Sequence, residues 1–187
     1  MSSPRIYKAE GIILKRRNVG ETDRILTVVT KEYGKIRVLA KGIRRVSSRR
    51  SPHVEVFTCV HLLIHRGKTL DVVSEVAPLA TFSSIRGDLG RLSVAYFYCE
   101  LVDTLIAERQ EHRQVYRLLL EALQWLNDAP ARSIYGRTKQ FALALLWDLG
   151  FLPRDKNLVG HELQSFIENI TEKHLHTPRF VRQILSS

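Results

Sequence analysis

Lysine and arginine side chains crowd the first fifty residues of the chain, and their types suit them to one kind of chemistry. The cations with this potential are Lys15, Arg16, Arg17, Arg24, Lys35, Arg37, Lys41, Arg44, Arg45, Arg49 and Arg50. A guanidinium offers a planar fork of N–H donors that fits phosphate oxygens, and cations that meet a nucleic-acid backbone release its counterions. The set therefore predicts a surface that binds the phosphates of a nucleic acid.

The distribution of charge along the chain supports this prediction. Residues 1–80 hold 16 Lys and Arg against 7 Asp and Glu, whereas residues 81–187 hold 13 against 12, so nearly all of the formal net charge of +10 lies in the first part. A basic half can also be a merely solvated surface that aids solubility. The concentration of the excess on one part favours a footprint for a polyanion.

The predicted elements place these cations. In a strand over residues 35–40, the period of two puts Lys35 and Arg37, with Lys41 beyond, on one face and the apolar residues on the other. Residues 42–51 mix arginine with glycine and serine, which is typical of a loop whose guanidiniums and hydroxyls donate to phosphates. Lys15 to Arg17 end the first strand and Arg24 opens the second. In a barrel these positions can converge into one groove along a nucleic-acid backbone.

Aromatic residues are scarce in the same part of the chain. Residues 1–80 contain only Tyr7, Tyr33 and Phe57, and Phe57 stands in an apolar run that predicts a core position. Proteins that hold single strands by stacking use several aromatic rings. Binding is therefore expected to be mainly electrostatic, weakly sequence-selective and open to single strands and duplexes.

No residue pattern indicates an enzyme. Glu21 and Asp23, two residues apart beside Arg24, fit turn-capping and ion-pairing roles better than acid–base catalysis. The chain contains no glycine-rich phosphate loop and no nucleophile elbow.

Cysteine and histidine usage predicts neither a metal nor a cofactor. Cys59 and Cys99 stand apart in apolar runs, which predicts buried free thiols and a reducing cytoplasm. The histidines at 161, 174 and 176 do not supply the four closely spaced ligands of a structural zinc site, and are expected to be exposed. The N-terminus has no apolar signal core and no run is long enough to span a membrane, so a soluble cytoplasmic protein is expected.

Hydrophobic periodicity divides the chain in two. Short β-rich runs over residues 9–14, 25–30, 35–40, 54–64 and 69–76 predict five strands, which a closed oligonucleotide-binding (OB) barrel satisfies best. After residue 84, helical stripes follow over residues 92–105, 115–126, 141–146 and 163–170, the third ending at Gly150. The expected fold is α+β and multidomain, with an OB-fold nucleic-acid-binding domain over residues 1–80 and an all-α domain over residues 81–187.

An ordered set of segments resembles the RecO family of bacterial recombination mediators. The segments are GETDRIL at 20–26, KEYGK at 31–35, AKGIRR at 40–45 with SRR at 48–50, and ELVD at 100–103, within a likeness that covers residues 6 to about 153. The resemblance implies an OB barrel followed by a helical domain, binding of single- and double-stranded DNA, and annealing of complementary strands. It also implies action with a RecR-like protein to load RecA onto DNA covered by single-strand-binding protein, in association with the nucleoid.

The chain departs from this family at one point. Many members carry a four-cysteine zinc module after a Gly-Phe/Tyr-x-Pro segment, which here is GFLP at 150–153, but no cysteine follows Cys99. The resemblance is therefore to a short form without the module, and purified protein is expected to hold no stoichiometric zinc.

A surface for single-strand-binding protein is expected in the helical part. Because the tails of such proteins are acidic and apolar, their site should combine cations with an apolar groove, and Arg132, Arg137 and Lys139 beside Phe141 fit that description. Two other functions remain open from composition alone. One is an RNA-binding barrel of translation or tRNA handling, and the other is a protein-docking scaffold whose charge is incidental.

Overall fold

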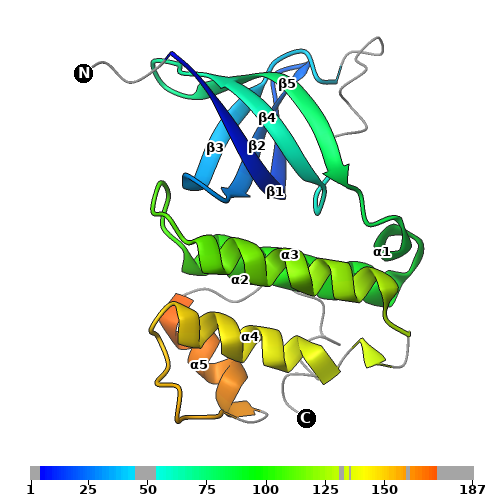
Figure 1. Cartoon of the computed structure of the whole chain (residues 1–187), viewed down its shortest axis with the longest axis vertical. Coiled ribbons are helices and arrows are strands. Elements are labelled where there is room, and N and C mark those ends of the chain that lie inside the picture. Colours follow the sequence, from blue (N-terminus) through cyan, green and yellow to red (C-terminus); the bar gives the residue numbers. More distant parts are fainter. Residues whose placement is uncertain (1–4, 45–53, 131–132, 135, 159–160, 172–187) are drawn as a thin grey trace. The chain divides into compact units, whose positions relative to one another are not determined.

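The structure is a computed structural model of the chain and describes residues 5–44, 54–130, 133–134, 136–158 and 161–171 (Figure 1). The chain divides into two compact units. One holds Met1–Thr81 together with Ile106–Tyr116, and the other holds Phe82–Leu105 and Arg117–Ser187. The segment 106–116 thus belongs with the first unit, although it lies between helical stripes in the sequence.

The first unit is a closed five-stranded barrel. Its strands are β1 (Ile6–Val19), β2 (Asp23–Thr30), β3 (Gly34–Ala40), β4 (Cys59–His65) and β5 (Asp71–Ala80). They are hydrogen-bonded in the order β1-β2-β3-β5-β4, and every pair is antiparallel except β3 with β5. The predicted α+β fold, with an N-terminal OB-type barrel and a helical part after it, is confirmed.

Alternation along the strands builds the barrel core. In β3 the side chains of Ile36, Val38 and Ala40 are all buried, as the period of two predicts. They pack in one cluster with inward residues of the other strands, such as Leu26 of β2 and Leu62 of β4. Closure of the sheet leaves few strand edges exposed to solvent.

The fourth predicted strand begins later than its apolar run suggests. Val54 and Val56 are buried, but β4 starts only at Cys59. Phe57 adopts a left-handed φ of 71° and its N–H donates to the Ile13 carbonyl at 2.9 Å, beside a bulge in β1. The apolar run therefore predicted correctly that these residues are buried, but its first residues form an irregular segment and not a strand. Phe57 is a core residue, as predicted.

The second unit is helical. Its helices are α1 (Ser83–Gly87), α2 (Leu89–Leu105), α3 (Arg113–Asp128, whose first turn belongs to the barrel unit), α4 (Gly136–Asp148) and α5 (His161–Thr171). Arg91 of α2 fastens the end of α3, because its Nη2 donates to the Ala129 carbonyl at 2.6 Å. The C-cap predicted at Gly150 is confirmed, since Gly150 has a φ of 77° and Phe151 N donates to the Leu146 carbonyl at 3.0 Å.

The segment 106–116 docks on the barrel within the first unit. Arg109 N donates to the Lys35 carbonyl at 2.8 Å, and the Tyr116 hydroxyl donates to Glu10 Oε1 at 2.7 Å. β5 pairs with β3 only at Val38 and Leu39, so the first half of β3 would have an open edge on that side. The segment covers this edge with a bridge between Lys35 and Glu108.

Candidate nucleic-acid interface

Three of the predicted cations come together where β1 and β2 meet. Arg16 of β1 forms an ion pair with Glu55, and Arg24 Nη1 lies 3.7 Å from Glu55 Oε1. Arg44, which follows β3, donates from Nη1 to the Gly20 carbonyl at 3.2 Å. We call Arg16, Arg24 and Arg44 the arginine cluster. Arg16 and Arg24 share the carboxylate of Glu55, and Arg44 adds a third positive charge that acts on Arg24.

Backbone contacts explain why these three arginines meet. The residues after β3 are tied to the turn between β1 and β2, because Arg44 N donates to the Thr22 carbonyl at 2.9 Å. Asp23 Oδ1 accepts from Gly42 N at 2.8 Å and from the Thr22 hydroxyl at 3.0 Å. Asp23 thus caps a turn, as predicted, and Glu21 is an exposed residue of that turn.

The arginine cluster carries uncompensated positive charge. Burial lowers the pKa of Arg24, the charges of Arg16 and Arg44 lower it further, and Glu55 opposes them. Among the described residues, the buried Arg24 Nη1 finds no hydrogen-bond acceptor. An anion beside the exposed guanidiniums of Arg16 and Arg44 would reduce the repulsion among the three positive charges.

The remaining predicted cations lie at several places. Lys15 and Arg17 are exposed, and strand alternation puts them on the face of β1 opposite to Arg16. Lys41 is exposed just before the residues that hold Arg44. Arg45, Arg49 and Arg50 lie outside the described residues.

The prediction that Lys35 and Arg37 share an open cationic face with Lys41 is wrong for Lys35. Its side chain is only 8% exposed, because the segment 106–116 covers the first half of β3. Arg37 remains exposed, but its Nε lies 2.6 Å from Glu108 Oε1. Glu108 therefore neutralises part of the surface that the sequence assigns to phosphate.

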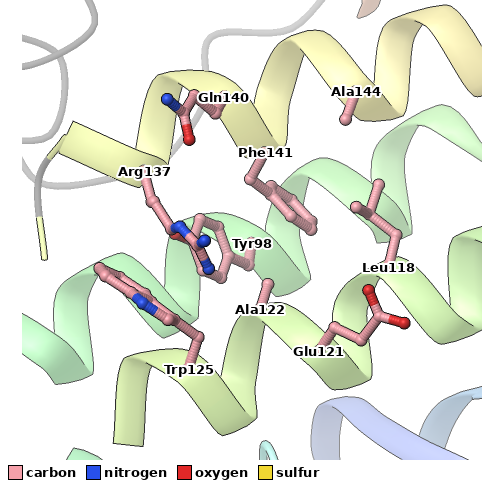
Figure 2. A pocket seen from close by; sticks show the side chains of 9 residues that line it. All are labelled: Tyr98, Leu118, Glu121, Ala122, Trp125, Arg137, Gln140, Phe141 and Ala144. Atoms are coloured by element: carbon pink, nitrogen blue, oxygen red, sulfur yellow. The ribbon is translucent and has the colours of Figure 1, made fainter. Parts of the chain in front are cut away.

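The helical unit contains a pocket of about 200 Å³ between α2, α3 and α4 (Figure 2). Aromatic and apolar side chains form much of its wall, with Tyr98 and Phe141 rings 4.1 Å apart between centres. The Arg137 guanidinium lies over the Trp125 ring at 4.8 Å from its centre. The structure thus joins Arg137 and Phe141 at one pocket, whereas Lys139 does not line it and Arg132 lies outside the described residues.

The described residues contain no group of three or more His, Cys, Asp or Glu side chains that could hold a metal ion. His161 is exposed as expected, and His174 and His176 lie outside the described part. Both cysteines are buried free thiols, which confirms that prediction, and burial raises the pKa of Cys59 and of Cys99. Within the same residues, no helix has the length and apolar content to cross a membrane.

Known proteins resemble both units. The family model described as recombination protein O N terminal matches residues 1–82, and that described as recombination protein O C terminal matches residues 86–157. Relatives named DNA repair protein RecO occur in Roseiflexus sp., 38% identical over 150 residues, Symbiobacterium thermophilum, 36% over 164, and Bifidobacterium adolescentis, 42% over 123. The matches cover 80%, 88% and 65% of this chain and 52%, 64% and 50% of those relatives. The chain thus spans between half and two-thirds of the length of these curated relatives.

Proposed function

The chain belongs to the recombination protein O family, and from this premise we propose that it is a non-catalytic, DNA-binding mediator of recombinational repair. It binds single- and double-stranded DNA through the barrel unit, anneals complementary strands, and acts with a RecR-like protein to help load RecA. The helical unit, without the segment 106–116, contacts single-strand-binding protein. The name of the curated relatives, DNA repair protein RecO, supports a role in repair.

The observation that carries this proposal is the arginine cluster. The guanidiniums of Arg16 and Arg24 share the carboxylate of Glu55, and Arg44 from a third segment adds a positive charge that acts on Arg24. A DNA phosphate has the negative charge that offsets this repulsion and oxygens that accept from the exposed Arg16 and Arg44. The exposed Lys41 adds positive charge just before the residues that hold Arg44, and the exposed Lys15 and Arg17 add it on the opposite face of β1.

The scarcity of exposed aromatic rings on the barrel supports a role in strand annealing. Phe57 is 1% exposed and Tyr7 8%, so Tyr33, at 36%, is the exposed aromatic ring among the described residues of the strands and their turns. Such a surface screens phosphate repulsion between two strands without covering many base edges. A strand-annealing assay on purified protein, with and without single-strand-binding protein, tests this function directly.

Salt dependence of DNA binding gives the first quantitative prediction. If about five phosphates are neutralised, the logarithm of the association constant for single-stranded DNA should fall with the logarithm of salt concentration at a slope of about −3.5. Fluorescence anisotropy titrations at salt concentrations from about 50 to about 300 mM measure this slope. A slope near zero removes the electrostatic basis of the proposal.

A competition experiment tests the RNA-binding alternative. If RNA competes for the protein as well as single-stranded DNA does, or better, the RNA-binding function is favoured.

The pocket in the helical unit supports a docking site for an acidic, apolar tail such as that of single-strand-binding protein. Arg137 supplies a cation at the rim and Phe141 an apolar wall. We expect Arg137→Ala to weaken binding of the tail peptide about tenfold, as loss of a charge-assisted contact predicts, with DNA affinity unchanged. Lys139→Ala is the matched control, because it removes the same charge from α4 outside the pocket. Equal losses in both variants would show that general charge, not this pocket, attracts the tail.

A further inference from the structure

A second group of side chains gathers at strand ends remote from the arginine cluster. Tyr7 lies at the start of β1, Arg66 directly after β4 and Asp71 at the start of β5. Tyr33 lies in the turn between β2 and β3, and Arg109 in the segment 106–116. Arg24 is the second residue of β2 (Asp23–Thr30) and Tyr33 follows the other end of the strand, so the length of β2 separates the two groups.

All three exposed members of the group contact one buried pair. The Tyr7 hydroxyl donates to Asp71 Oδ2 at 2.7 Å. The Tyr33 ring meets the Tyr7 ring edge-on, with 4.9 Å between centres, and Arg66 Cζ lies 5.1 Å from the centre of the Tyr7 ring. Arg109 Nη2 lies 3.5 Å from Asp71 Oδ2. The Tyr7–Asp71 pair therefore fixes where an aromatic ring and two guanidiniums stand relative to one another.

The buried pair is a stable support. Tyr7 and Asp71 are 8% and 4% exposed. Burial by itself raises the pKa of Asp71, but hydrogen bonds from Tyr7 and from Gly67 N, together with the charge of Arg109, lower it overall. Burial and the bond to Asp71 raise the pKa of Tyr7. At neutral pH the pair is therefore a protonated tyrosine on an ionised carboxylate, which holds Arg109 in place.

The backbone at Arg109 is also unusual. Its φ of 62° lies in the left-handed region, which a residue other than glycine adopts rarely and only where its surroundings hold it. The hydrogen bond from Arg109 N to the Lys35 carbonyl supplies part of that constraint. The guanidinium is nevertheless accessible, since the side chain is 60% exposed.

We propose that Tyr33, Arg66 and Arg109 bind one unpaired nucleotide of a single-stranded nucleic acid, with its base stacked on Tyr33 and its flanking phosphates on the two guanidiniums. This inference rests on the proposed DNA-binding function and adds a site that distinguishes single strands from duplexes. A base in a duplex has no free face for a protein ring, whereas a phosphate is accessible in both forms. The arginine cluster accepts both forms, and the Tyr33 site favours single strands.

The test compares Tyr33→Leu with Tyr33→Phe in the full chain, using a labelled oligo-dT and a duplex of equal length. Since stacking on one aromatic ring is worth about 1–3 kcal/mol per base, Tyr33→Leu should weaken oligo-dT binding by about five-fold or more. Tyr33→Phe, which keeps the ring, should stay within about twofold of the parent, and neither variant should alter duplex binding. Duplex binding also reports that both variants are folded.

Photocrosslinking supplies a second readout that does not depend on a variant. An oligo-dT carrying 5-iodouracil should crosslink to Tyr33, and trypsin should release the adduct on the peptide from Glu32 to Lys35, because cleavage follows Lys31 and Lys35. Arg66→Gln should make the single-strand salt slope shallower by about 0.7. Lys8→Gln, an exposed cation next to Tyr7 on the opposite face of β1, is the matched control and should change it less.

The outcomes separate this site from the function on which it rests. Equal loss of single-strand and duplex binding in Tyr33→Leu, or no loss in either, overturns the nucleotide site while a steep salt slope of the parent keeps the DNA-binding proposal. Crosslinks that fall only on peptides without Tyr33 overturn it as well. A parent chain that binds no DNA at any salt concentration overturns both.

Discussion

Replacing Arg44, Arg45, Arg49 and Arg50 together with alanine is expected to lower the affinity for single-stranded DNA by about two to three decades at 0.1 M salt. Each phosphate contact contributes about 0.7 to the salt slope, so four lost contacts make the slope shallower by about 2.8. Duplex binding and strand annealing should fall in parallel. Anisotropy titrations over a range of salt concentrations, with an annealing assay beside them, measure these effects.

The quadruple variant should remain folded. Arg44 is the member of the four that lies in the described part of the chain, and its side chain is exposed. The hydrogen bond from its backbone N to Thr22 survives substitution by alanine. Surface substitutions usually change the free energy of unfolding by no more than about 0.5 kcal/mol each.

A control of equal charge separates local contacts from the net charge of the chain. It replaces four exposed cations that lie after the barrel strands, namely Arg113, Arg117, Arg154 and Lys156. If this control loses as much affinity as the quadruple variant, the effect belongs to net charge alone. If the quadruple variant binds and anneals like the parent, residues 44–50 are a solvated linker and the DNA surface must lie on the helical part.

Local patterns predicted most of the elements of this fold, because they report burial. The period of two identified β3 and its inward residues, and the glycine at 150 predicted the end of α4 from its backbone requirement alone. The same signal failed at Val54 and Val56, which are buried in an irregular segment. Hydrophobicity indicates that a side chain is buried, but it does not indicate whether the backbone of that residue pairs with a strand.

The candidate site was predicted less completely, because its counter-charges come from distant segments. Arg16, Arg24 and Arg44 could be expected to converge once the barrel closes. The positions of Glu55 and Glu108 depend on where two non-strand segments dock. The polar residues around Glu108 have the composition of an ordinary link between helices, and no periodicity shows that such a link returns to β3 and covers Lys35.

Because the segment 106–116 docks against the barrel beside Gly34, adding a single methyl group at Gly34 should have a large effect on stability. Gly34 has a φ of 65°, and a Cβ built there would overlap the backbone carbonyl of Gln110 in the segment 106–116. Gly34→Ala combines the cost of a left-handed alanine with that of an overpacked contact. It should therefore lower the free energy of unfolding by about 2 to 5 kcal/mol. Denaturant melts measure this loss. Displacement of the segment should also expose the Lys35 amine, so its labelling by an acylating reagent should rise.

Gly20→Ala is the matched control, since Gly20 has a similar φ of 56° but no atom within 4 Å of its added Cβ. Its cost should be confined to the backbone conformation, about 1 to 2 kcal/mol, and it should leave Lys35 protected from labelling. The difference between the two variants therefore isolates the close approach of Gln110 to the β2–β3 turn. Equal destabilisation by both substitutions, with Lys35 equally protected in both, would mean that the segment 106–116 does not press against this turn in solution, and that Lys35 owes its burial to other contacts.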